Sequence, residues 1–396
     1  MRTRTSPRIL LLLSCFMIGA IPASVFAMEG MWDKLVDPDL VWGEEIISPA
    51  KIVEERNGVP VYSKEVVSKT YKVDKIYKSM EGPASLVKFN FLDGPPELIW
   101  LISYEATMVD AEVTTDLGND FMCHSTLDIA NTRRYTDRFP TEMFAANGRI
   151  FTLAQGQLDV KFPDGFGIPF MSNEKVILIS QVLNHNIPDL DIDVRQRIEI
   201  KFIRNRDLPE PLTPLVTAGA VAMKLLAGED GHFGLSAEEV ETVEHGPGCL
   251  IGENRGNLKY VKMDGHGRSF TTFWKVEPGR EVNHTRANDY LQMRRDTRIH
   301  YVASHLHPFA ESLELRDLTT GKTVYKATTV QAEGKIGLDT VTYYSSEEGI
   351  PLHKFHEYEI ISVYDNTSGV LQDSMANMIL YLHAADMYDF YFKKDR

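Results

Sequence analysis

Short runs of β-branched and aromatic residues, each closed by Gly, Pro, Asn or Asp, recur along most of this chain. In the first half they include SLVKFNF (85–91), ELIWLISYEA (97–106), RIFTLAQGQLDV (149–160), KVILISQVLNH (175–185) and VRQRIEIKFIR (194–204). In the second half they include KTVYKATTV (322–330), HEYEIISVYDN (356–366) and ANMILYLHAA (376–385). Runs of this composition and length predict β-strands. Their number and spacing predict an all-β protein of the sandwich or jelly-roll type.

The strand pattern is interrupted once, near the middle of the chain. The segment RDLPEPLTP (206–214) carries three prolines, and a stretch rich in Ala and Gly follows it. We therefore expect two tandem antiparallel jelly-roll (β-sandwich) domains joined by a partly helical linker. The predicted boundaries are 45–205 for the N-terminal domain, 206–248 for the linker and 249–396 for the C-terminal domain.

The first 27 residues have the pattern of a secretory signal peptide. Arg2, Arg4 and Arg8 precede the apolar run ILLLLSCFMIGAI, and Val25-Phe26-Ala27 forms a small-residue cleavage sequence. We expect cleavage after about Ala27 and export to a periplasm or to the extracellular space. No later run is long and apolar enough to predict stable membrane insertion.

The charge of the chain argues against a nucleic-acid partner. The formal net charge is −14, and loss of the three arginines of residues 1–27 brings it to −17. A phosphate backbone requires clustered Lys and Arg, which this chain lacks. The same segment contains Cys15, so Cys123 and Cys249 remain, and the sequence leaves open whether they form a disulfide.

The pair His305 and His307 is the most specific chemical signal in the chain. It lies in RIHYVASHLHPFAESLELRD (298–317), where Ile299, Tyr301 and Val302 favour a strand. Residues two apart on a strand project from the same face, so both imidazoles could reach one metal ion. Two histidines are only half of a metal site, however, and the spacing alone favours a solvated strand face.

Three further groups could complete such a site. Met375, in SMANMILYLH, offers a soft thioether that suits Cu(I), although a single methionine is more often packed in a core. Cys123 and His124 are adjacent, and adjacent strand residues share an ion only at a bulge or a strand end. His185 ends the run LISQVLNH. No hydrolase elbow, zinc-protease helix or phosphate-binding glycine loop is present.

Taken together, these segments resemble the copper type II ascorbate-dependent monooxygenases. SHLHPFAESLELRD is similar to the family's His-x-His strand, and SMANMILYLH to the strand that carries its methionine ligand. FMCHSTLDI and QLDVKFPDGFGIPF are similar to segments of its first domain, in the same order. The resemblance implies a catalytic copper held by His305, His307 and Met375. It also implies hydroxylation of a C–H bond of a small organic substrate, with O2 as co-substrate and electrons from ascorbate or another donor.

The chain departs from the family at the second, electron-transfer copper. Where the family has two adjacent histidines this chain has Cys123 and His124, and direct alignment puts Leu183 at the third position. His185 lies two residues further on the same strand face and could substitute for it. A Cys123, His124 and His185 set is therefore a candidate second copper site, and a vestige is the equal alternative.

Substrate recognition also departs from the peptide-amidating branch of the family. Its carboxylate-binding positions correspond here to Ala303, Asn377 and Ile379, so only the asparagine is kept. Asn377 is thus a candidate substrate-binding residue, and a C-terminal glycine peptide is not the expected substrate. Two alternatives to the enzyme remain open: a non-catalytic copper-binding protein on the same scaffold, and a structural or glycan-related β-sandwich protein.

Overall fold

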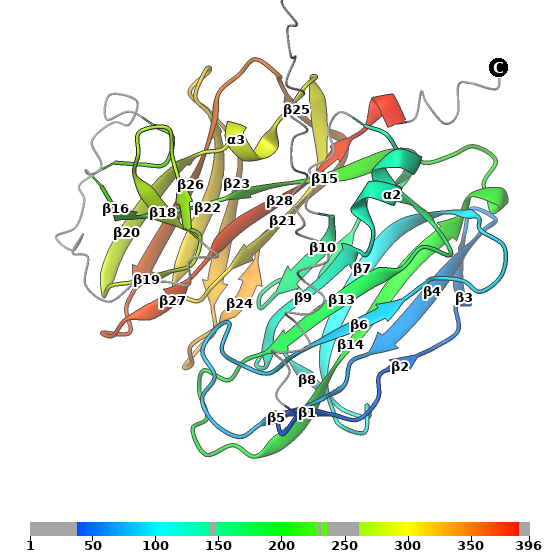
Figure 1. The fold of residues 1–396 in the computed structure, drawn as a ribbon, viewed down its shortest axis with the longest axis horizontal. Coiled ribbons are helices and arrows are strands. Elements are labelled where there is room, and N and C mark those ends of the chain that lie inside the picture. The colour runs from blue at the N-terminus through cyan, green and yellow to red at the C-terminus, as the bar shows by residue number, and fades with distance from the viewer. Residues whose placement is uncertain (1–37, 142–147, 229–230, 236–260, 388–396) are drawn as a thin grey trace, which may run out of the picture. The chain divides into compact units, whose positions relative to one another are not determined.

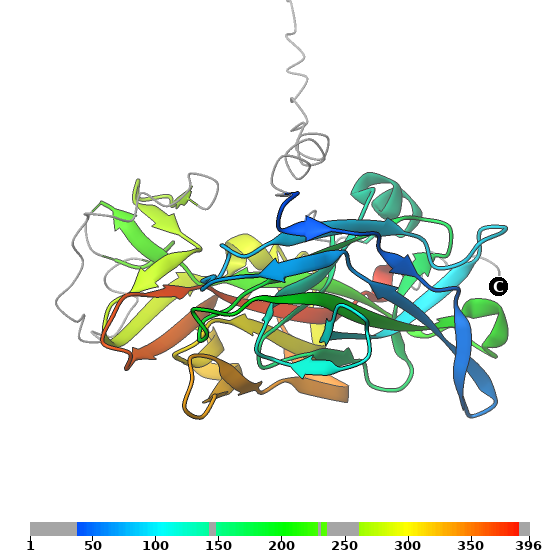
Figure 2. The same cartoon turned by 90° about the horizontal axis from the view of Figure 1, so that it is seen from below.

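The computed structural model describes residues 38–141, 148–228, 231–235 and 261–387, and strands make up most of them. This confirms the all-β fold class. The α-helices named among the described residues are α2 (Thr132–Arg138) and α3 (Asn288–Leu291), which are short. The ribbon in Figures 1 and 2 is accordingly built almost wholly of arrows. The predicted signal peptide, Cys15 and Cys249 lie outside the described residues.

The strands form one large sheet and several smaller ones. The large sheet has the order β1 (Val41–Trp42), β5 (Thr70–Val73), β14 (Ile192–Arg204), β7 (Leu98–Asp110), β12 (Phe166–Met171), β15 (Thr213–Val221), β28 (Ala376–His383), β21 (Thr297–Leu306) and β25 (Tyr344–Leu352). Five more strands pair with members of this sheet without lying on the path: β2 (Ile46–Ile47), β3 (Lys51–Arg56), β4 (Val59–Val67), β8 (Asp116–Gly118) and β11 (Asp159–Lys161).

Two of the smaller sheets provide most of the remaining strands. The first has the order β10 (Arg149–Ala154), β9 (Met122–Ile129), β13 (Val176–Val182) and β6 (Ala84–Phe89). The second has the order β20 (Gly279–Arg286), β26 (Tyr358–Asn366), β22 (Ala310–Asp317), β23 (Lys322–Gln331) and β24 (Leu338–Val341). Short sheets join β16 (Lys224–Ala227), β18 (Ser269–Thr271) and β17 (Val261–Met263), and β19 (Trp274–Val276) with β27 (Gln372–Ser374).

Strands from both predicted domains share the path of the large sheet. The linker strand β15 joins them: it runs parallel to β12, through the pairs Phe166 with Thr213 and Gly167 with Pro214, and antiparallel to β28. Every other strand pair is antiparallel. The division at 45–205 and 249–396 is not tested by this arrangement and stays a prediction.

The predicted linker differs from the partly helical segment that its alanines suggested. In its described part it contains β15 and β16, and a single 3-10 turn, η1 (Asn205–Asp207), stands at its start. The physical reason lies in the packing of β15. Ala218 and Ala220 are fully buried and Gly219 faces β28, so small residues here fit a crowded strand rather than a helix.

Aromatic and aliphatic side chains from both halves form one main hydrophobic core. Trp100, Tyr104, Phe151, Tyr301 and Tyr381 are all completely buried within the structure. Phe151 and Phe162 of the first half contact Tyr381 of the second, with ring centroids 6.1 and 4.8 Å apart. Because burial of apolar area is the main favourable contribution to folding, these contacts hold the two groups of strands together.

A close backbone approach near the end of β13 allows only glycine. A Cβ atom added at Gly82 would lie 2.0 Å from the carbonyl oxygen of Val182. That approach is fixed by two hydrogen bonds, from Gln181 Nε2 to the Gly82 carbonyl and from the Val182 amide to the Pro83 carbonyl.

We therefore expect Gly82→Ala to lower the free energy of unfolding by about 1 to 3 kcal/mol, the usual cost of overpacking. Urea titration followed by tryptophan fluorescence measures the change. The matched control is Gly265→Ala, where an added Cβ meets nothing within 4 Å. Equal stability of the two variants would contradict the prediction.

Candidate metal centre and adjoining cavity

The predicted histidine pair lies at the end of a central strand. β21 pairs with β28, and its last two registers are His305 with Asn377 and Leu306 with Ala376. His305 and His307 are only 6% and 4% exposed. Directly opposite residues on an antiparallel pair lie on the same face. The Asn377 side chain therefore neighbours the His305 imidazole.

The two imidazoles meet edge to face, and three of their four ring nitrogens lack a hydrogen-bond partner. Their ring centroids are 5.3 Å apart. Both ring nitrogens of His305 and the Nδ1 of His307 are buried, and within the described part of the chain none of the three has a partner. A buried polar atom without a partner costs about 1 to 3 kcal/mol. Such atoms therefore call for an explanation, and a bound ligand is one.

Met375 stands immediately before β28. Continuing the register of β21 and β28 by one residue places it opposite His307, on the same face. Its carbonyl oxygen accepts a hydrogen bond of 2.7 Å from the hydroxyl of Tyr364. The His307 imidazole in turn interacts with the backbone of Asp373. The segment that carries Met375 is thereby held next to the histidine pair.

His124 reaches the same region from the four-stranded sheet. It lies on β9, and its ring centroid is 6.3 Å from that of His305. The register of β9 and β13 passes from Gln181 with His124 to Val182 with Met122, so Cys123 is the extra residue of a β-bulge. The sequence required such a bulge if Cys123 and His124 were to share an ion.

Cys123 and His185 lie near Asp373. The Cys123 thiol is buried and unpaired, and burial raises its pKa to about 12. The Asp373 carboxylate raises the pKa of both residues, and for Cys123 it adds to the effect of burial. His185 Nε2 lies 3.5 Å from Ser79 Oγ, and its buried Nδ1 has no partner in the described residues. A second copper site at Cys123, His124 and His185 stays a prediction.

Burial holds all four imidazoles in the neutral form. It lowers the pKa of His305 and of His185 to about 4 and that of His124 to about 3. It also lowers the pKa of His307 well below its ordinary value, and His305, His185 and His124 add to that effect. A neutral imidazole has a free lone pair, which is the form that binds a transition metal.

The donor set at His305, His307 and Met375 fits a soft metal ion. Two neutral imidazoles and a thioether suit Cu(I), and three of the four imidazole nitrogens are orphaned. Within the described residues, no three His, Cys, Asp or Glu side chains are arranged to hold an ion. That finding does not cover this set, because methionine is not one of those residue types.

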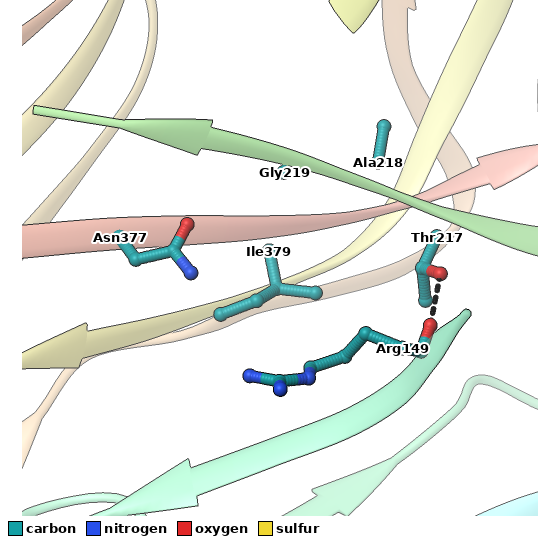
Figure 3. Close-up of a pocket in the computed structure, with 6 residues that line it drawn as sticks. All are labelled: Arg149, Thr217, Ala218, Gly219, Asn377 and Ile379. Carbon is teal, nitrogen blue, oxygen red and sulfur yellow. Dashed lines mark hydrogen bonds between the residues drawn. The ribbon is translucent and has the colours of Figure 1, made fainter. Parts of the chain in front are cut away.

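A cavity of about 220 Å³ has Asn377, the register partner of His305, in its lining. It is lined by residues of β10, β15 and β28 (Figure 3), namely Arg149, Thr217, Ala218, Gly219, Asn377 and Ile379. The Arg149 side chain is 33% exposed, and its Nε donates to Asp128 Oδ1 at 2.8 Å. The Thr217 hydroxyl donates to the Arg149 carbonyl oxygen. The cavity is therefore polar at the end near Arg149 and apolar at Ile379.

Arg149 was not predicted from the sequence, although it lines the same cavity as Asn377 and Ile379. It stands at the start of β10, and its proximity to β28 depends on how two separate sheets pack. No local pattern in the sequence reports that packing.

Comparisons with known proteins assign no family to this chain. No family model matches it, and no curated protein does. Among solved structures, the insecticidal delta-endotoxin Cry8Ea1 from Bacillus thuringiensis is similar at 11% identity and a TM-score of 0.18. The match covers 89% of this chain and 55% of the toxin chain, so the chain spans about half of that neighbour. Separately, none of the helices in the described ranges is long and apolar enough to cross a membrane.

Proposed function

We propose that this protein is an exported copper-dependent monooxygenase that hydroxylates a C–H bond of a small organic substrate. O2 is the co-substrate, and ascorbate or another donor supplies the electrons. The observation that carries the proposal is the buried His305 and His307 pair with its orphaned ring nitrogens, together with a cavity lined by Asn377, the register partner of His305. The resemblance of the histidine and methionine strands to the copper type II monooxygenases supports the same conclusion.

His305, His307 and Met375 would hold the copper ion. Copper bound by these ligands supplies the capacity to reduce and activate dioxygen. The protein contributes a dry site, because both imidazoles are buried and remain neutral. A neutral imidazole offers its lone pair without first losing a proton, so metal binding does not compete with protonation near neutral pH.

Asn377 and Arg149 would orient the substrate. Asn377 Oδ1 is buried against β15, where a Cβ added at Gly219 would lie 3.7 Å from it. Figure 3 shows the amide nitrogen of Asn377 turned toward the side on which the Arg149 guanidinium lies. Both groups donate hydrogen bonds, which favours a substrate whose polar end accepts them. The apolar part of the substrate would lie against Ile379, and its end at Asn377 would lie nearest His305, the register partner of Asn377.

Oxygen uptake by the purified, copper-loaded protein tests the proposal. With ascorbate present, we expect uptake that depends on an added substrate with a hydrogen-bond-accepting end. Metal-free protein and copper-loaded His307→Ala are the controls for free copper. If a broad substrate panel elicited no uptake above these controls, hydroxylation would be excluded.

The alternative is a copper carrier on the same scaffold, and one observation favours it. The Cys123, His124 and His185 set differs from the paired-histidine site that delivers electrons in the family. A carrier would bind copper reversibly and hand it to a stronger chelator without consuming oxygen. Tight copper binding with no substrate-dependent oxygen uptake would therefore support the carrier.

The cavity itself gives a prediction that separates substrate binding from metal binding. Gly219→Val should raise KM at least about tenfold, because branched methyl groups would occupy space next to Asn377. Copper content should stay at the wild-type level. Gly219→Ala is the matched control, since its Cβ makes only ordinary contact at 3.7 Å. An unchanged KM in the valine variant would show that the substrate binds elsewhere.

A further inference from the structure

The cavity lined by Asn377 contains a charged residue whose charge is already balanced. Arg149 of β10 lies directly opposite Asp128 of β9 in the strand register, so the two side chains lie on one face. Arg149 Nε donates to Asp128 Oδ1 at 2.8 Å, and Nη2 donates to Oδ2 at 3.3 Å. This two-bond contact is the strong form of an arginine–carboxylate pair. The Asp128 side chain is only 14% exposed, so water screens the pair only in part.

The other described residues that line the cavity carry no charge. Four of them belong to β15 and β28 and are small or aliphatic, and the fifth is Asn377. Asn377 Oδ1 is buried, whereas its Nδ2 takes part in no hydrogen bond with the described residues. Figure 3 shows the Arg149 side chain extending past Ile379 toward Asn377. The polar end of the cavity therefore presents N–H donors from a wall without net charge.

This charge balance decides which polar groups the cavity can bind. A carboxylate would lose its water here, would meet a guanidinium that Asp128 already neutralises, and would be repelled by Asp128 itself. An ammonium group would face the N–H groups of Asn377 and Arg149, with which it cannot form hydrogen bonds. A neutral carbonyl costs much less to dehydrate, and it accepts hydrogen bonds from both residues.

We propose that this cavity binds uncharged molecules with a carbonyl acceptor at one end and an apolar chain at the other, and that it rejects carboxylates. The carbonyl would lie between Asn377 and Arg149, and the chain against Ile379. The volume of about 220 Å³ equals that of about seven water molecules, which suits a small organic molecule. As a statement about the substrate this inference rests on the proposed function, but the binding itself requires no copper.

Three molecules of one shape test the inference on the metal-free protein at pH 8: heptan-2-one, hexanamide and hexanoate. They share a pentyl chain and differ only in the second group on the carbonyl carbon. Titration followed by ligand-observed NMR gives the Kd of each. We expect the ketone and the amide to bind at least about tenfold more tightly than the carboxylate. Gly219→Val should abolish binding of the ketone and the amide, because its side chain occupies the cavity.

Asp128→Asn tests the cause of the selectivity. The amide keeps the shape of the carboxylate and leaves the charge of Arg149 unbalanced, so hexanoate should bind at least about tenfold more tightly than it binds the wild type. The affinity for heptan-2-one should change less than about threefold, because a ketone carries no charge. The matched control is Asp116→Asn, which removes a surface pair with Arg197 of 2.8 Å and should leave all three affinities unchanged.

Several results would overturn the proposal. Hexanoate that bound the wild type as tightly as the ketone would contradict the charge balance, and so would an unchanged preference in Asp128→Asn that thermal melting shows to be folded. If that variant did not fold, Asn377→Leu would decide instead. It removes the amide donor, so ketone binding should weaken about threefold to tenfold, and an unchanged affinity would count against the cavity.

The site of binding and the proposed function are tested separately. Absence of ketone and amide binding, or equal binding by Gly219→Val, would overturn this inference while leaving the copper centre untouched. Selective binding without substrate-dependent oxygen uptake by the copper-loaded protein would confirm the cavity's preference and overturn only the hydroxylation.

Discussion

Replacement of His307 by alanine is expected to lower copper affinity more than about 100-fold, the largest effect on metal binding of any single change in this chain. His307 contacts His305, lies within electrostatic reach of His124 and His185, and stands opposite Met375 by the strand register. Its removal would leave His305 and a thioether, which is too few ligands for tight binding. Competition with a chromophoric Cu(I) chelator measures the loss.

Two variants separate the role of the ligand from damage to the fold. His266→Ala removes an exposed imidazole and should leave copper affinity unchanged. Met375→Leu keeps the apolar volume and removes the thioether, so it should weaken Cu(I) binding more than Cu(II) binding. If His307→Ala retained wild-type affinity while it remained folded, the copper centre would lie elsewhere.

Strand identity and the position of the histidine pair were predictable from the sequence, because both depend on short-range patterns. The β-branched and aromatic residues Ile299, Tyr301 and Val302 predicted β21, and the i, i+2 spacing predicted that both imidazoles share a face. β15 was not predicted, because its alanines favour a helix and are uncommon in strands unless the packing around them requires small residues. The sequence showed that Cys123 and His124 could share an ion only at a bulge or a strand end. The register of β9 with β13 shows that Cys123 is in a bulge.

The sequence could not predict which residues of different sheets lie close together at the site. The approach of His124 to His305 and of Arg149 to Asn377 joins residues more than 150 positions apart. Such contacts depend on how one sheet packs against another, and the residue pattern within a single strand does not indicate that packing. Residues that a family pattern assigns to separate sites can therefore lie close together, as His124 and His305 do.

Acid should destabilise the metal-free protein strongly because of the same buried imidazoles. Burial lowers the pKa of His305 to about 4, against about 6.5 in the unfolded chain. Between these values the unfolded state binds a proton that the folded state does not bind. The contribution of His305 is therefore complete above pH 6.5 and is lost as the pH falls toward 4. Between pH 8 and pH 5 the loss is about 2 kcal/mol from this residue alone, and His185 acts in the same direction.

Urea unfolding of metal-free protein at pH 8 and pH 5 measures this loss, and His305→Asn isolates the imidazole. The variant has no group that titrates in this range at position 305, so its stability should fall by about 2 kcal/mol less than that of the wild type over the same interval. His266→Asn, at an exposed position, should keep the full pH dependence. Equal pH dependence in His305→Asn and the wild type would mean that His305 is protonated in the folded protein. A protonated His305 has no lone pair to offer a metal ion, and the copper assignment would lose its main support.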